Sequence, residues 1–299
     1  MPKTLLLAQT LLTAVAVFLR IMVNPLANVF QKQLTAKSNH PLAVNFLTYF
    51  LLALGCVPFM FGIAWPGIDK DFWLYSIMGG IVGAMGNGFL VKALEKGELS
   101  VLGPINAYKS VVSMLIAVFL LQEIPGLWGL IGVALIIYGS YFILDTTEQK
   151  FSWALFKRSE IQFRIWAMIL TAIEAVFVKK TIAASSVSIA FIGWCCFGAV
   201  FSFLLLFFYR VNIAGQIRQA RNYYVQYFLL VACVGIMQLT TNYAFDHMPV
   251  GYALALFQLS VIASVILGHR IFSEKDIQKK LIGAAIMIAG SILLILLKR

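Results

Sequence analysis

The chain has 299 residues, of which 61% are hydrophobic and only 12% are charged. Soluble globular proteins carry about 25% charged residues, so this composition excludes that class and indicates an integral membrane protein. The formal net charge is +11. Most of the Lys and Arg residues lie in short connectors between apolar runs, which favours contact with anionic lipid and argues against nucleic-acid binding.

Apolar runs of the length needed to cross a bilayer recur along the chain. They predict an all-α membrane protein with ten transmembrane helices, at about 6–31, 42–63, 72–93, 99–121, 126–144, 163–182, 187–209, 224–245, 250–271 and 279–297. The most polar connector, at about 145–162, divides these helices five and five. We therefore expect two domains, 1–146 and 147–299, both embedded in the lipid bilayer.

The first expected span carries a polar stripe. Arg20, Asn24, Asn28 and Gln31 recur at i, i+4, i+8 and i+11, which places them on one helix face. Polar and ionisable side chains at membrane depth are costly, and they commonly mark a substrate path. We expect this stripe to bind substrate along a translocation path, with a hydrogen-bonded seam between helices as the alternative.

The third and fourth expected spans add further candidates. Gly79 and Gly83 form a small-residue packing motif, and Asn87 follows on the same face. The fourth span carries Tyr108 and, near its middle, Lys109, which lies too deep to reach either membrane surface comfortably. We expect Asn87, Tyr108 and Lys109 to contact the substrate.

Glu174 lies near the middle of the sixth expected span, at a depth similar to that of Lys109. Either these opposite charges form an ion pair or each contacts the substrate, and both alternatives stay open. In the second case Glu174 is also a candidate for coupling transport to a proton.

The eighth expected span carries Gln238 and Asn242 one helical turn apart, and the ninth adds Tyr252 and Gln258. Gln238 aligns with Asn87 through the repeat described next. We expect these polar positions to form a central substrate site between the two halves.

The second half of the chain repeats the first. Residues 93–144 align without a gap on residues 244–295, at an offset of 151, and the matches include Glu123/Glu274, Gly132/Gly283 and Gly139/Gly290. A duplicated unit with an odd number of spans inserts in opposite orientations, which is the inverted-repeat plan of many secondary transporters. We expect Glu123 and Glu274, each at a span end, to cap the helix that follows.

Two five-span repeats, each with a glutamate closing its fourth helix before a Gly-rich fifth helix, resemble the drug/metabolite transporter superfamily. The closest resemblance is to its EamA-type ten-helix members, such as bacterial amino-acid exporters, and it covers essentially the whole chain. It implies a bacterial inner-membrane location. Small multidrug relatives use a first-helix glutamate, which corresponds in the second half to Glu174. The chain departs from the pattern at Asn24-Pro25, where an aromatic-Gly pair is common.

We therefore expect a secondary-active transporter that exports a small polar metabolite, an amino acid or similar zwitterion, by alternating access. An organic-anion or sugar-phosphate exchanger is the alternative, and a non-transporting membrane protein or lipid enzyme is a weaker one. The sequence has no cluster of catalytic side chains, no ATP-binding loop and no metal-ligand spacing, so we expect neither enzymatic activity, nor a cofactor, nor a metal ion. We expect a monomer to be functional.

The positive-inside rule predicts that both termini lie outside the cytoplasm. Of 23 Lys and Arg, two lie within expected spans, 15 (Arg164 among them) lie on the side of the connectors after odd-numbered spans, and six lie on the side of the termini. EamA-type relatives have cytoplasmic termini, so the two indications differ. A C-terminal fluorescent reporter that matures only in the cytoplasm should stay dark, and bright cells would contradict the charge-based prediction.

Overall fold

The computed structural model describes residues 3–37, 39–109, 111–112, 126–146 and 155–296, and their regular elements are all helical. Most of these helices are long apolar runs, as the sequence predicts. The elements are α1 (Lys3–Ala36), α2 (Pro41–Met60), η1 (Trp65–Gly67), α3 (Lys70–Lys96), α4 (Leu99–Ile105), α6 (Leu127–Leu144), η2 (Leu155–Lys157), α7 (Ser159–Ala183), α8 (Val187–Phe208), α9 (Ile213–Arg221), α10 (Tyr224–His247), α11 (Val250–Phe257), α12 (Ser260–Phe272) and α13 (Ile277–Leu296).

Within the described residues, eight segments are long and apolar enough to cross a membrane. They correspond to the expected spans one to three and five to nine, so an all-helical, multi-pass membrane protein is confirmed. The fourth expected span, 99–121, continues into residues outside the description, and the tenth corresponds to α13. The total of ten spans therefore stays a prediction.

Side-chain caps satisfy first-turn N–H groups at the starts of α2, α3, α8 and α9. His40 Nδ1 accepts from the N–H of Leu42 at 3.3 Å, next to Pro41 as the first residue of α2. Asp69 Oδ1 accepts from the N–H of Asp71 at 3.0 Å at the start of α3. These caps define where α2 and α3 begin.

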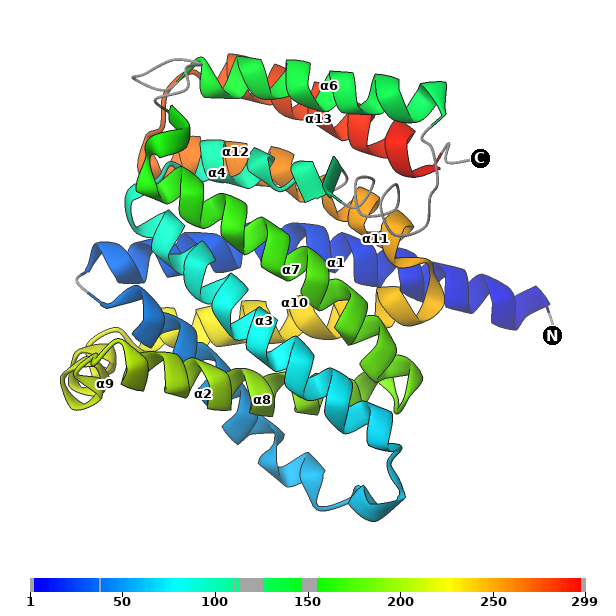
Figure 1. Ribbon diagram of the computed structural model, residues 1–299, viewed down its shortest axis with the longest axis vertical. Coiled ribbons are helices and arrows are strands. Elements are labelled where there is room, and N and C mark those ends of the chain that lie inside the picture. The colour runs from blue at the N-terminus through cyan, green and yellow to red at the C-terminus, as the bar shows by residue number, and fades with distance from the viewer. Residues whose placement is uncertain (1–2, 38, 110, 113–125, 147–154, 297–299) are drawn as a thin grey trace.

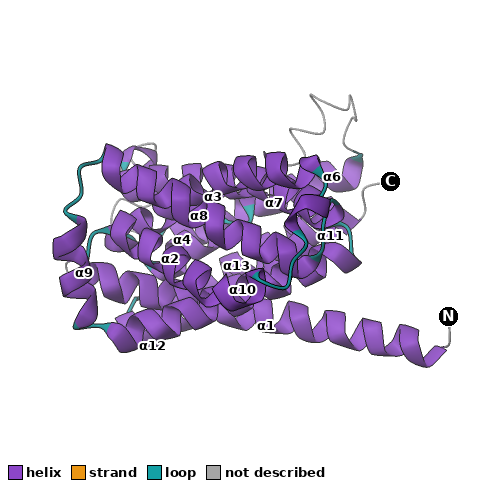
Figure 2. Ribbon diagram, turned by 90° about the horizontal axis from the view of Figure 1, so that it is seen from below, coloured by secondary structure: helices purple, strands orange, loops and turns teal. Residues whose placement is uncertain are grey.

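The helices pack as four neighbouring pairs, each joining one helix from either half of the chain. α6 lies beside α13 at one edge, α2 packs on α8 at the other, and the pairs α3–α7 and α1–α10 lie between them (Figure 1). α1 begins and α13 ends at the same end of the bundle (Figure 1), and the N-terminal part of α1 projects beyond it (Figure 2).

α6 and α13 meet through the glycines that the repeat matches. A Cβ atom on Gly139 would lie 2.7 Å from the carbonyl oxygen of Gly283, and one on Gly290 would lie 2.6 Å from that of Gly132. Only glycine permits so close a backbone approach. Because Gly132 and Gly139 meet their partners in reverse order, the two helices run antiparallel.

A buried ion pair also joins the two halves. The Glu274 carboxylate accepts from the N–H groups of Leu99 at 2.7 Å and Ser100 at 2.8 Å, and from Lys32 Nζ at 2.9 Å. Glu274 therefore caps α4 in the first half. The prediction that it caps the helix following it, α13, is wrong, because the chain turns through a left-handed residue at Ser273 (φ 54°) and carries the side chain toward α4. Glu123 lies outside the described residues.

We predict that this cap stabilises the fold through its charge. Burial opposes ionisation of Glu274, but Lys32 and the groups at Ser100 outweigh it and hold its pKa below the ordinary 4.5. A lowered pKa stabilises the folded state above the ordinary value, and this stabilisation is lost as the pH falls through the lowered value. Glu274→Gln should therefore destabilise the protein by about 2 kcal/mol at pH 7.

The measurement is the melting temperature of the purified protein against pH. The difference in melting temperature between wild type and Glu274→Gln should become smaller as the pH falls below 4.5. Asp145→Asn is the control, because the side chains of its pair with Lys279 are 26% and 59% exposed, so neither charge is buried. A gap that does not change with pH would show that the charge of Glu274 contributes nothing.

Candidate functional site

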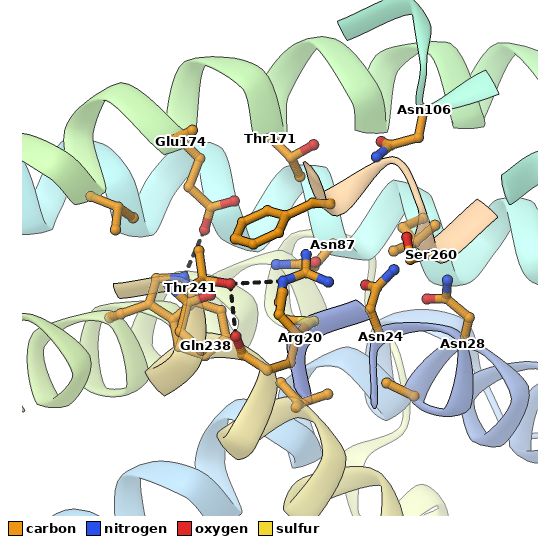
Figure 3. A pocket seen from close by; sticks show the side chains of 18 of the residues that line it. Arg20, Asn24, Asn28, Asn87, Asn106, Thr171, Glu174, Gln238, Thr241 and Ser260 are labelled. Carbon is orange, nitrogen blue, oxygen red and sulfur yellow. Dashed lines mark hydrogen bonds between the residues drawn. The ribbon is translucent and has the colours of Figure 1, made fainter. Parts of the chain in front are cut away.

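A cavity of about 120 Å³ lies between the helices of the two halves. Side chains of α1, α2, α3, α7, α8, α10, α11 and α12 line it, together with Asn106 and Lys109 after α4. Figure 3 shows Arg20 and Asn24 from α1 facing Glu174 and Thr171 from α7. Its polar and charged lining residues are Arg20, Asn24, Asn28, Gln31, Asn45, Thr48, Tyr49, Asn87, Asn106, Lys109, Arg164, Thr171, Glu174, Trp194, Gln238, Thr241 and Ser260.

Most of the substrate-binding residues expected from the sequence meet in this cavity. The stripe on α1 faces it along its whole length, from Arg20 to Gln31, a spacing of three helical turns. The sequence-predicted residues that line it are Arg20, Asn24, Asn28, Asn87, Lys109, Glu174 and Gln238.

The other four expected residues lie outside the cavity lining. The Tyr108 hydroxyl is 2.7 Å from Ser140 Oγ on α6. Asn242 is fully buried, with its side-chain amide 2.9 Å from that of Gln238. Tyr252 is 40% exposed. Gln258 is buried at an interruption of the ninth span.

Two helices are interrupted at positions that the repeat matches. α4 ends at Ile105, and the ninth span divides into α11 and α12 between Phe257 and Ser260. The ninth expected span is still long and apolar enough to cross a membrane, but both spans contain an interruption that the sequence did not predict. At the offset of 151, Ala107 corresponds to Gln258. Gln258 Nε2 donates to the carbonyl oxygen of Asn106 at 3.2 Å. A side chain at one interruption thus satisfies a backbone group at the other.

Arg20 is held from the side of α10 and α11. Its Nε donates to Thr241 Oγ1 at 2.7 Å, and its guanidinium lies over the Phe257 ring, 4.9 Å from the centroid. Its Nη1 atom is buried without a hydrogen-bond partner. An orphaned buried donor is rare in folded proteins, since it costs free energy comparable to a lost hydrogen bond.

Glu174 is held from the opposite side of the cavity. Its Oε1 accepts from Trp194 Nε1 at 2.7 Å, and the carboxylate lies against Gly83 of α3. Within the described residues no Lys or Arg nitrogen is within 4.0 Å of it. The ion pair between Lys109 and Glu174, left open by the sequence, is therefore not formed in this structure.

Arg164 is a cavity residue that the sequence analysis counted among the connector charges, and that assignment is wrong. It lies inside α7, is 6% exposed, and donates from Nε to the carbonyl oxygen of Leu102 at 2.7 Å. Without Arg164, the number of Lys and Arg on the side of the odd-numbered connectors falls by one. That side still carries more of them than the side of the termini, so the predicted orientation is unchanged.

Two aromatic side chains were also missed. The rings of Tyr49 and Trp194 lie 4.6 Å apart, and the Tyr49 hydroxyl accepts from Asn87 Nδ2 at 2.5 Å. This chain of contacts connects Asn87 to Glu174 across α2 and α8. Asn45, which donates to Ser202 Oγ at 3.0 Å, extends the polar wall.

The described residues contain no group of three His, Cys, Asp or Glu side chains that could hold a metal ion. The side chains that line the cavity place hydrogen-bond donors and acceptors around a small space.

Comparisons with known proteins bear on what such a site does. A model of the EamA-like transporter family matches residues 10–145 and 158–296. A solved structure described only as "Crystal structure of protein" is similar over 98% of each chain, with 16% sequence identity and a TM-score of 0.62, a likeness that shows the fold alone. No curated protein matches the chain in sequence.

We predict that Gly83→Ala impairs substrate handling more than folding. The new Cβ atom would meet the Glu174 carboxylate, the movable end of a flexible side chain, at 2.3 Å. The carboxylate should swing away and lose its hydrogen bond to Trp194, while the helices stay packed. Gly80→Ala is the contrast, because its Cβ atom would meet Phe197 Cβ at 2.6 Å and its backbone at 3.1 Å.

Two measurements on the same preparations separate the variants. Gly80→Ala should lower the melting temperature markedly, since backbone cannot yield as a side chain does. Gly83→Ala should melt close to wild type yet lose transport activity. Equal destabilisation of both variants would contradict the assignment of Glu174 to the site.

Proposed function

Because the chain belongs to the EamA-like transporter family, we propose that it is a secondary-active transporter that moves a small polar metabolite through the central cavity by alternating access. The observation that carries this proposal is the cavity itself. It concentrates charged and amide side chains from both halves at a place enclosed by apolar spans. Such side chains inside a membrane are costly unless they serve a substrate or ion path.

The packing supports an inverted arrangement of two five-helix repeats, 1–146 and 147–299. The pair α1–α10 corresponds through the repeat to the pair α7–α3, and both pairs are formed. The matched helices α6 and α13 run antiparallel through matched glycines. Equivalent helices that run in opposite directions are what an inverted repeat requires.

The paired helix interruptions supply a place for movement. Discontinuous helices that meet at a central site recur in carriers of this plan, since short helical segments can tilt without breaking a long helix. The bond from Gln258 to the carbonyl of Asn106 joins the two interruptions in this conformation. We expect it to break when the cavity opens to the other side.

The size and lining of the cavity favour a small polar cargo over a bulky drug. Its volume of about 120 Å³ is below the range of about 300–1,000 Å³ typical of sites for drug-sized ligands. An exported amino acid or similar zwitterion would fit this description. Its carboxylate would meet Arg20 or Lys109, and Glu174 would meet its ammonium group or exchange a coupled proton.

We predict that Lys109→Ala and Glu174→Gln each abolish transport in proteoliposomes with only a modest loss of expression. Neither side chain has an ion-pair partner within the described residues, so neither replacement leaves an opposite charge stranded. Lys180→Gln, on the exposed side of α7, is the control and should transport normally. Normal transport by the double variant of Lys109 and Glu174 would refute the role of these charges.

A further inference from the structure

The charges that line the cavity do not balance. Three cationic side chains, Arg20, Lys109 and Arg164, face it together with one acidic side chain, Glu174. All four side chains line the same cavity, so they share one site. Resting on the transport function proposed above, we propose that the cargo is a small dianion, a dicarboxylate or a phosphate monoester, held between these cations.

None of the three cations is neutralised by a protein carboxylate within the described residues. Arg20 bonds to a hydroxyl and Arg164 to a backbone carbonyl, both of which are uncharged acceptors. The Nη1 atom of Arg20 is buried with no acceptor at all. Uncompensated cations in a low-dielectric interior repel one another and attract an anion strongly.

The cations lie on both sides of the meeting point of the helix interruptions. Arg20 packs on Phe257, the last residue of α11. Arg164 bonds to Leu102 of α4, and Lys109 follows the interruption after Ile105. A dianion could therefore contact Arg20 on the side of the ninth span and Lys109 and Arg164 on the side of the fourth and sixth spans.

The arithmetic of charge separates this cargo from a zwitterion. Three cations and one ionised carboxylate leave two positive charges. An amino acid with no net charge would leave both uncompensated, whereas a dianion cancels them. The Glu174 carboxylate is also engaged by the indole N–H of Trp194, which leaves it less free to bind an ammonium group.

The first test measures ligand binding as thermal stabilisation of the purified protein, since a ligand that binds only the folded state raises its melting temperature. Succinate is compared with the neutral succinamide, glycerol phosphate with glycerol, and glutamine serves as the zwitterion. We expect succinate or glycerol phosphate to stabilise the protein. A larger rise in melting temperature with succinate indicates a dicarboxylate site, and a larger rise with glycerol phosphate indicates a phosphate site. Equal or greater stabilisation by succinamide, glycerol or glutamine would overturn the proposal.

The second test compares ligand binding by variants that raise the net positive charge of the cavity with binding by variants that lower it. Glu174→Gln raises the net positive charge of the cavity, so it should tighten binding of a dianion. For a zwitterion, the same replacement removes the partner of the ammonium group, so it should weaken binding. Arg20→Gln and Lys109→Gln should each weaken dianion binding by about ten-fold or more, as expected for one charge-assisted hydrogen bond. The Lys109 side chain forms no hydrogen bond within the described residues, so its variant should fold, and Lys180→Gln should bind as wild type does.

Counterflow in proteoliposomes then separates this inference from the proposed function. If a neutral or zwitterionic solute moves and no anion binds, the carrier function stands and the dianion proposal fails. If dianions bind with the expected variant effects but no solute moves, the dianion site stands and the transport function fails.

Discussion

The cost of holding ionised side chains away from water governs how this protein is built. The bundle contains two kinds of buried charge. Lys32 and Glu274 neutralise each other between α1 and the turn before α13. Arg20, Arg164 and Glu174 are instead held in place by uncharged groups, a hydroxyl, a carbonyl and an indole N–H. The first kind joins helices of the two halves, whereas the second kind lines the cavity.

Glycine determines how closely the helices that carry these charges can approach. Between α6 and α13, glycine lies against glycine backbone, which gives a tight contact far from the cavity. Between α3 and α7, Gly83 faces the carboxylate of Glu174 and leaves room for it. The same residue type therefore sets packing at the edge of the bundle and the position of a charged group at its centre.

The sequence predicts the fold class well, because long apolar runs and an ungapped repeat depend only on local composition and spacing. It also predicts the polar face of α1, since the period of a helix brings Arg20, Asn24 and Asn28 onto one side. It fails for Arg164. This residue is the sixth of α7, close enough to the start of the helix to be taken for a connector charge. Trp194 gives no signal, because an aromatic residue in an apolar run equally suits a surface that faces lipid.

The remaining errors share one cause, which is dependence on distant contacts. The end of α4 at Ile105 and the division between α11 and α12 become intelligible only once Gln258 is seen to reach Asn106, 152 residues away. The role of Glu274 as the cap of α4 likewise depends on a turn that no local pattern specifies. Spacing along one helix therefore predicts a face, but not the partner that the face will meet.

The cap of α4 has a consequence for how the chain is made. The N–H groups of Leu99 and Ser100 receive their acceptor from a residue synthesised 175 and 174 positions later. At about 5–20 residues per second, that delay is on the order of ten seconds or more. During this interval the start of α4 lacks the carboxylate that accepts from Leu99 and Ser100 in the folded protein. Both halves match the same family model, yet the start of α4 in the first half takes its acceptor from the second.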